Sequence, residues 1–310
     1  MEHKTRYDIA IIGGGLAGLT LAIQGAEAGF SVALFEKEQY PFHKVCGEYI
    51  SNESYGFLEQ LGVPLQKWQL PKINTLQLSD VKGKLVEFDL PLGGFGVSRY
   101  TLDNALYKIA LEKGAAIFTE TKVLDVRFSA DIFSIDTTAG VFTSRIAVGS
   151  FGKKSNLDLK WNRPFTQHKP DKLNNYIGVK YHVHYDAPDN LIALHNFKNG
   201  YCGMSKIDKN RYCLCYLTNA ENLQKSGKSV KEMEAKILYQ NPKLKKIFET
   251  AVFLYQEPLV ISQISFHKKS QIENHVMLIG DTAGVITPLC GNGMSMAKKK
   301  KKIAFEHISK

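Results

Sequence analysis

Unbroken runs of apolar residues alternate with a segment of helical periodicity near the start of the chain. Residues 7–13 (YDIAIIG) form one such run and predict a buried parallel strand, because parallel strands are covered on both faces. Residues 16–28 carry apolar and small side chains at helical spacing and predict a helix that Gly29 ends. The run SVALFEK predicts a second buried strand that ends at Glu36. These segments predict a βαβ unit of about thirty residues.

The middle of the chain changes to a different strand pattern, and the end returns to the first one. Residues 74–98 alternate between apolar and polar positions, with a turn signal at Lys82-Gly83, and predict antiparallel strands. Residues 175–220 are again rich in strand patterns, whereas residues 275–285 (HVMLIGDTAGV) predict a third buried strand that runs into a loop. The chain is therefore expected to leave an α/β nucleotide-binding domain, form a β-sheet domain, and return.

Three glycines in the spacing G-x-G-x-x-G lie between the first predicted strand and the first predicted helix. Gly13 permits a tight turn, Gly15 lets the backbone approach a pyrophosphate, and Gly18 lets the helix pack against the sheet. The start of the helix offers unpaired N–H groups and a positive dipole end to phosphates. Glu36 is placed to accept hydrogen bonds from a ribose diol. The pattern predicts a dinucleotide site, with a glycine-rich turn that binds no ligand as the alternative.

Two further motifs bear on which dinucleotide would bind. Gly280-Asp281 follows the third buried strand, and Gly291-Asn292-Gly293 opens another helical segment. The other motif, R-x-x-L-D-x-x-L, begins at Arg99. Together with the glycine loop, these motifs resemble those of the geranylgeranyl reductase and p-hydroxybenzoate-hydroxylase-like flavoprotein superfamily, and they occur in the family's order.

The resemblance implies FAD as the cofactor and an α/β fold, with a Rossmann-like FAD-binding domain of the GR2 type and an inserted, mainly antiparallel substrate domain. The FAD-binding domain is expected to comprise residues 1–73, 99–165 and 270–310, and the substrate domain residues 74–98 and 166–269. An exposed helix charge is the alternative interpretation of Arg99. The implied FAD contacts are Gly13, Gly15, Leu16, Ala17, Gly18, Glu36, Lys37, Lys44, Cys46, Gly47, Arg99, Val123, Gly280, Asp281, Gly291, Asn292 and Gly293.

The segment Lys44-Val45-Cys46-Gly47-Glu48 matches a K-x-C-G element of the geranylgeranyl reductase branch. The resemblance implies that this loop passes along the isoalloxazine ring, and Gly47 then suits a close approach. Cys46 is interpreted as part of the wall of the flavin pocket, or as a thiol that tunes or protonates an intermediate, which would make it catalytic. A structural cysteine is the remaining alternative. A metal site is not expected, because His43 and Cys46 are only two candidate ligands.

Three features depart from the family pattern. Phe151 stands where the family has the aspartate of an Asp-Gly motif that is linked to NAD(P)H contacts. Tyr201 matches the tyrosine of a lipid-pocket element whose tryptophan and Phe-Pro are missing, and it is a candidate substrate contact or ordinary sheet packing. The chain ends soon after the Gly-x-Gly segment, in a helix interrupted by five lysines at positions 298–302, which predicts a truncated C-terminus.

The composition limits the expected partners and the expected cellular location. The 310 residues carry a formal charge of +10, but the lysine run supplies half of it and the rest is dispersed, so no nucleic-acid partner is expected. The five cysteines are scattered and do not predict a disulfide framework. No apolar run is long enough for a transmembrane span, and a cytoplasmic protein is expected. Peripheral membrane contact is compatible with a lipid substrate.

The expected activity is that of a geranylgeranyl-reductase-like, FAD-dependent oxidoreductase. It would transfer hydride through flavin N5 to an unsaturated small molecule or lipid, with NAD(P)H as the candidate external reductant. One alternative is a flavin monooxygenase that hydroxylates, epoxidises or halogenates its substrate through a C4a-hydroperoxide. The other is a flavin-binding remnant without turnover, which Phe151 and the lysine run suggest.

Overall fold

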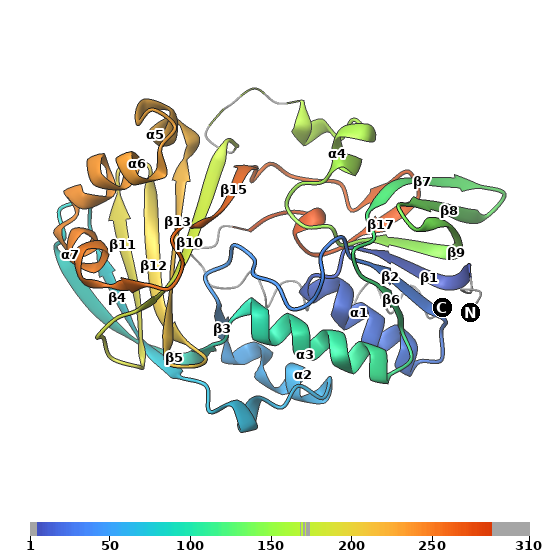
Figure 1. Ribbon diagram of the computed structural model, residues 1–310, viewed down its shortest axis with the longest axis horizontal. Coiled ribbons are helices and arrows are strands. Elements are labelled where there is room, and N and C mark those ends of the chain that lie inside the picture. Colours follow the sequence, from blue (N-terminus) through green and yellow to red (C-terminus); the bar gives the residue numbers. More distant parts are fainter. Residues whose placement is uncertain (1–4, 168, 170, 172–173, 287–310) are drawn as a thin grey trace.

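The computed structural model describes residues 5–167, 169, 171 and 174–286, and they form two β-sheets with helices packed on each (Figure 1). Sheet A has the order β16-β17-β9-β1-β2-β6, and β7 and β8 extend it from β9 as a meander. Its strands are β1 (Arg6–Ile12), β2 (Val32–Phe35), β6 (Ala116–Phe118), β7 (Val123–Ser129), β8 (Ile132–Thr137), β9 (Gly140–Gly149), β16 (Ile272–Glu273) and β17 (Val276–Leu278).

The centre of sheet A is parallel. β1 pairs in parallel with β2 and β9, while β6 and β17 extend the parallel set on its two sides. Helices α1 (Leu16–Glu27), α2 (Tyr55–Gln60) and α3 (Arg99–Glu112) share an apolar core with one face of these strands. The opposite face packs against the meander and α4 (Asn156–Lys160). Because both faces are covered, β1 and β2 can be almost wholly apolar, as the sequence predicts.

Sheet B has the order β14-β10-β13-β12-β11-β4-β5-β3, with β15 paired to β10. All its pairings are antiparallel except that of β4 with β11. Its strands are β3 (Tyr49–Ser51), β4 (Lys72–Ser79), β5 (Leu85–Gly96), β10 (Tyr176–His184), β11 (Leu191–Phe197), β12 (Gly200–Ile207), β13 (Arg211–Asn219), β14 (Val252–Phe253) and β15 (Leu259–Ile264).

One face of sheet B is covered by α5 (Ala220–Lys225), α6 (Val230–Lys236) and α7 (Pro242–Thr250) (Figure 1). The other face looks toward the loops at the carboxyl ends of the strands of sheet A, so ligands bound there would lie between the two sheets. Short 3₁₀ helices complete the described chain: η1 (Asn52–Ser54), η2 (Leu65–Trp68), η3 (Pro164–Thr166), η4 (Leu238–Gln240) and η5 (Gly280–Thr282).

The predicted fold class, an α/β domain with a separate and mainly antiparallel sheet, is confirmed. The division of the sheets is not identical with the expected domain boundaries, since β3 and the start of β4 lie in the segment 1–73 but belong to sheet B. The boundaries themselves stay a prediction. None of the described helices is both long enough and apolar enough to cross a bilayer.

Candidate active site

The glycine loop after β1 has the geometry that its sequence predicts. Gly13 has a φ of +103°, a left-handed conformation that glycine adopts without strain. A Cβ on Gly18 would lie 2.1 Å from the carbonyl oxygen of Gly13, so only glycine lets α1 start this close to the strand. Gly15 is the N-cap of α1, and the first turn of that helix contains no acidic residue. The positive end of the helix dipole is therefore left for a ligand anion.

Glu36 supports the loop from the end of β2. Its buried carboxylate accepts hydrogen bonds from the backbone N–H groups of Gly14 at 2.9 Å and Glu38 at 3.1 Å. The Tyr40 hydroxyl donates to the Gly14 carbonyl at 2.5 Å. Glu36 thus shapes the glycine loop itself, which is a role that the sequence prediction of a ribose contact did not include.

Two cations border the open side of Gly15. A Cβ at Gly15 would lie 3.8 Å from Lys44 Nζ and 3.9 Å from an Arg99 terminal nitrogen, with no backbone atom among its nearest neighbours. Arg99 donates two hydrogen bonds to Asp103, at 2.7 and 2.8 Å, while Lys44 Nζ lies 3.5 Å from Asp103 and 3.9 Å from Glu36. Burial lowers the pKa of Lys44. A dianionic diphosphate in this space would gain two cationic partners.

The Gly280-Asp281 motif lies beside the start of α1. Gly280 has a φ of +60°, and a Cβ on it would lie 3.0 Å from Cβ of Ala17, so the two segments touch. Lys153 Nζ lies 4.0 Å from an Asp281 carboxylate oxygen. Residues 13–18, 99 and 280–281, far apart in the chain, therefore border one region. The predicted contacts Gly291, Asn292 and Gly293 lie outside the described residues.

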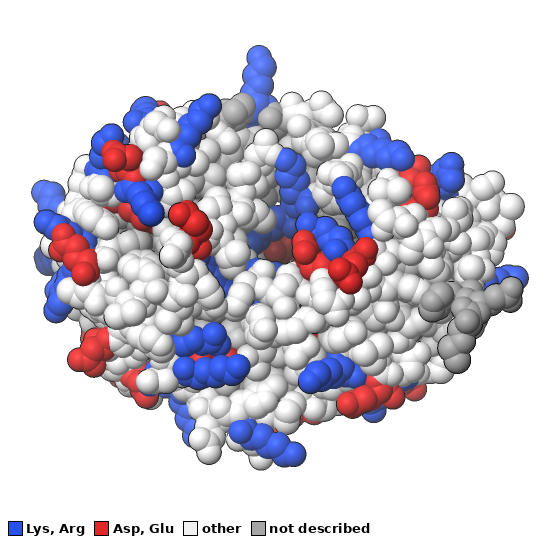
Figure 2. Space-filling model, in the orientation of Figure 1, with Lys and Arg blue, Asp and Glu red and all other residues white. Residues whose placement is uncertain are grey.

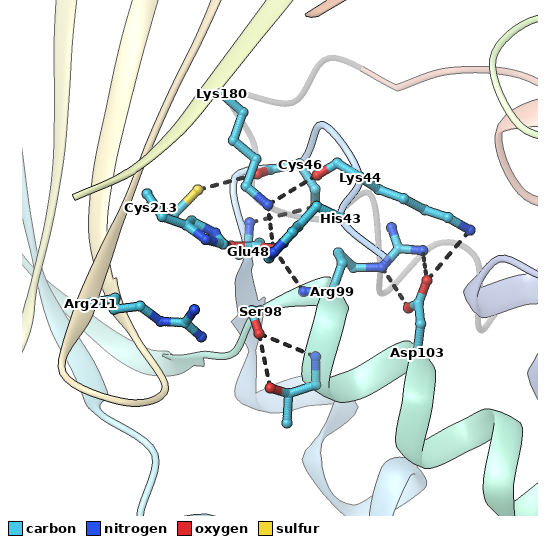
Figure 3. A network of polar contacts seen from close by, with 12 residues as sticks. His43, Lys44, Cys46, Glu48, Ser98, Arg99, Asp103, Lys180, Arg211 and Cys213 are labelled. Atoms are coloured by element: carbon cyan, nitrogen blue, oxygen red, sulfur yellow. Dashed lines mark hydrogen bonds and ion pairs between the residues drawn. The ribbon is translucent and has the colours of Figure 1, made fainter. Parts of the chain in front are cut away.

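The Cys46 loop bridges this region and sheet B (Figure 3). Cys213 Sγ donates to the Cys46 carbonyl at 3.3 Å, and Lys180 Nζ donates to the Lys44 carbonyl at 3.0 Å. A Cβ on Gly47 would meet nothing within 4 Å, so this part of the loop borders open space. The loop has the room and the exposed backbone that a flat ring system needs for close approach.

Glu48 is the site residue that sequence reasoning missed. Its fully buried carboxylate accepts from Lys180 Nζ at 2.5 Å, from His182 Nε2 at 2.6 Å and from the backbone N–H of Arg99 at 2.7 Å. Burial alone would raise the pKa of Glu48, but Lys180 and His182 outweigh burial and lower the pKa to about 2. Glu48 lies within the segment Lys44–Glu48, but its partners lie on β10 and at the start of α3, and no sequence signal links these positions to it.

The depressed pKa of Glu48 predicts a loss of stability in acid. A group whose folded pKa lies below its unfolded pKa, here about 2 against 4.5, stabilises the fold above the unfolded value. We expect this contribution to be lost as the pH falls from about 5 to about 2. Urea unfolding of the protein and of Glu48→Gln across this range tests it. The difference in unfolding free energy between them should shrink toward low pH, and a constant difference would contradict the assignment.

Glu48, His182 and Cys213 also place three potential metal-ligand atoms within 4.8 Å of one another. The Lys180 ammonium already neutralises the carboxylate, and a second cation there would be repelled. Burial raises the pKa of the Cys213 thiol well above its usual range, which disfavours the thiolate that binds metals. The arrangement suits a buried ion pair better than a metal centre.

Figure 2 shows a hollow near the centre of one face, between the two sheets, with both basic (Lys and Arg) and acidic (Asp and Glu) side chains at its rim. Sheet B supplies one wall. Tyr201 lies on the same face of sheet B as Cys213, because β12 alternates and Ser205 pairs with Cys213. On this face, outward from Tyr201, lie the half-buried or exposed apolar side chains of Leu76, Leu78, Val86, Phe88, Ile192 and Leu194. The wall is thus apolar beyond the polar centre.

Two other predicted contacts, Val123 and Lys37, lie away from this region, whereas Phe151 lies beside the glycine loop. Val123 begins β7 and packs in the core of sheet A, two residues after Thr121, whose N–H donates to the Glu36 carbonyl. Lys37 is exposed and pairs with Glu38 at 3.3 Å. Phe151, which stands where the family has an acid, is half-buried and packs edge-on against Trp161 at 6.0 Å between ring centroids, while its backbone lies beside Gly13.

Comparison with known proteins agrees with this geometry. Residues 8–44 match the family described as FAD binding domain. The chain is 22% identical to digeranylgeranylglycerophospholipid reductase 1 of Methanothermobacter thermautotrophicus, over 95% of this chain and 75% of that protein. It superposes on the flavin-dependent brominase Bmp2 with a TM-score of 0.81 at 21% identity, covering 98% of this chain and 79% of that one. Residues 8–44 thus carry an FAD-binding sequence, and the chain is similar to geranylgeranyl reductases in sequence and to flavin-dependent halogenases in fold.

The similarity to these proteins extends over almost the whole of this chain but only over part of each relative. Conditioned medium factor receptor 1 of Dictyostelium discoideum is 24% identical over 98% of this chain, which spans 63% of that protein. The likeness to Bmp2 concerns the fold, because its sequence identity is low. The activity and substrate of this flavoprotein are therefore matters of proposal.

Proposed function

We propose that this flavoprotein is an FAD-dependent reductase that adds hydrogen across a carbon–carbon double bond of a long apolar, polyprenyl-type substrate. The observation that carries the proposal is the convergence of the glycine loop, Arg99, Lys44 and Gly280-Asp281 beside the Cys46 loop, opposite the apolar wall of sheet B. The curated relative named as a digeranylgeranylglycerophospholipid reductase supports this substrate class.

The residues of this chain fit FAD by charge and by space. The start of α1 and the cations of Arg99 and Lys44 would hold the diphosphate, and Glu36 would fix the loop that approaches it. Gly47 borders the open space that would take the isoalloxazine ring. Bound FAD would supply hydride-transfer chemistry, with NAD(P)H as the proposed external reductant.

The protein's own part in the reaction is to exclude water, orient the substrate and provide a proton. Hydride addition to one carbon of a double bond must be matched by a proton at the other. Cys46 Sγ–H, on the half-exposed loop between the two sheets, is the proposed donor. Tyr201 and the apolar side chains beyond it would hold the hydrocarbon chain on sheet B.

This function is tested with purified protein and FAD. We expect an oxidised-flavin absorbance spectrum, and, after anaerobic reduction, reoxidation when geranylgeraniol is added, with a product heavier by H₂ for each double bond reduced. Cys46→Ala should retain FAD and slow this reoxidation about 100-fold. If the bound, reduced flavin is reoxidised neither by geranylgeraniol nor by its phosphates, the result would contradict the proposal and favour a flavin-binding remnant without turnover. An oxygenated product formed only with oxygen would favour a monooxygenase.

A further inference from the structure

Glu48 connects three parts of the molecule that are distant in sequence. Its partners Arg99, Lys180 and His182 are 51, 132 and 134 residues away. Arg99 opens α3 on sheet A, while Lys180 and His182 lie on β10 of sheet B. In addition, the Glu48 carbonyl accepts the N–H of Val97 at 3.0 Å. The residue is therefore a junction between the Cys46 loop and both sheets (Figure 3).

The hydrogen bonds around Glu48 define a balanced pair of charges. An ionised carboxylate only accepts hydrogen bonds, so the proton between it and His182 must lie on Nε2 of the ring. Nδ1 of His182 is buried and has no hydrogen-bond partner within the described part of the chain. The Lys180 ammonium lies directly against the Glu48 carboxylate and is its buried counter-charge.

The backbone conformation of Glu48 would suit glycine better than a residue with a side chain. Glu48 has a φ of +57°, which costs free energy for any residue with a Cβ and nothing for glycine. The preceding residue, Gly47, has no such constraint. A carboxylate is thus held in a strained conformation at a point of the loop where it reaches all three donors.

We propose that Glu48 is a positioning residue. It holds residues 43–48 against β10 and α3, so that Cys46 and Gly47 keep their places beside the flavin. This inference rests on the proposed function for its flavin part. The tether itself is a property of the protein without cofactor, and the two parts can therefore fail separately.

Hydrogen exchange of the apoprotein tests the tether. Glu48→Gln strands the Lys180 ammonium in the interior, so the decisive variant is Glu48→Gln/Lys180→Met, which removes both charges and keeps the side chains' size. We expect its Tm to recover toward that of the parent, while the amides of Arg99 and of residues 44–48 exchange at least about tenfold faster. Exchange that stays at the parent rate in a variant of recovered Tm would overturn the proposal.

FAD titration of the same apoproteins tests the consequence. The double variant is expected to bind FAD about tenfold or more weakly than the parent despite its recovered Tm. Glu48→Gly/Lys180→Met, which relieves the backbone strain, should be equally impaired. A merely structural role predicts that FAD affinity recovers together with Tm, and that outcome would refute positioning.

Glu112→Gln, on an exposed turn of α3, is the matched charge control and should leave both Tm and FAD affinity unchanged. A parent that binds no FAD refutes the proposed function, while the exchange result still decides the tether.

Discussion

Replacing Arg163 with methionine should lower the free energy of unfolding by about 3–5 kcal/mol. The guanidinium is completely buried and donates to Asp158 at 2.6 Å and to the carbonyls of Thr282 and Ser270, each at 3.1 Å. Methionine fills much of the volume but leaves the buried Asp158 without its counter-charge and two carbonyls without this donor. The loss should appear as a lower midpoint in urea unfolding with an unchanged slope.

The same substitution should also weaken FAD binding, because Thr282 ends the short helix that begins with Gly280-Asp281. Arg145→Met is the matched control. Arg145 is exposed and lies 3.9 Å from Asp8, so its loss should cost less than about 0.5 kcal/mol and leave FAD affinity unchanged. Equal effects of the two substitutions would show that the buried arginine has no special part in the fold.

The strands and the glycine loop could be predicted because their determinants are local. An apolar run predicts β1, and the spacing of Gly13, Gly15 and Gly18 encodes the turn, the open side of the loop and the close contact of α1. The Gly280-Asp281 motif could also be placed, because it too follows a buried strand. These features depend on residues that are near one another in sequence, so a single chain suffices to find them.

The charged core of the site was not predictable in the same way. The pairs of Glu48 with Lys180 and of Arg163 with the carbonyl of Thr282 join positions more than a hundred residues apart. No periodicity or spacing records such a pairing, because it follows from the packing of sheet B against the loops of sheet A. The start of sheet B at β3, before the expected boundary at residue 74, has the same origin, since its pairing with β5 is non-local.

Gly15→Ala should reduce FAD affinity about tenfold to a hundredfold and leave the apoprotein almost as stable as the parent. Gly15 has ordinary extended dihedral angles, and a Cβ there meets only the flexible ends of Lys44 and Arg99, at 3.8 and 3.9 Å. The cost to the apoprotein should be below about 1 kcal/mol, the usual difference between glycine and alanine at an N-cap. The methyl group would instead occupy the space where a diphosphate approaches the backbone.

Gly18→Ala should have the opposite pattern and is the natural control. Its Cβ would lie 2.1 Å from the Gly13 carbonyl oxygen and 2.6 Å from Ser150 Oγ, so the strand and α1 must separate whether or not FAD is present. We expect a loss of about 2–3 kcal/mol in the unfolding free energy of the apoprotein. Urea unfolding and FAD titration of both apoproteins separate the two glycines. Wild-type affinity in Gly15→Ala would place the diphosphate elsewhere, because a ligand that crosses this loop closely enough to need a glycine cannot tolerate the added methyl group.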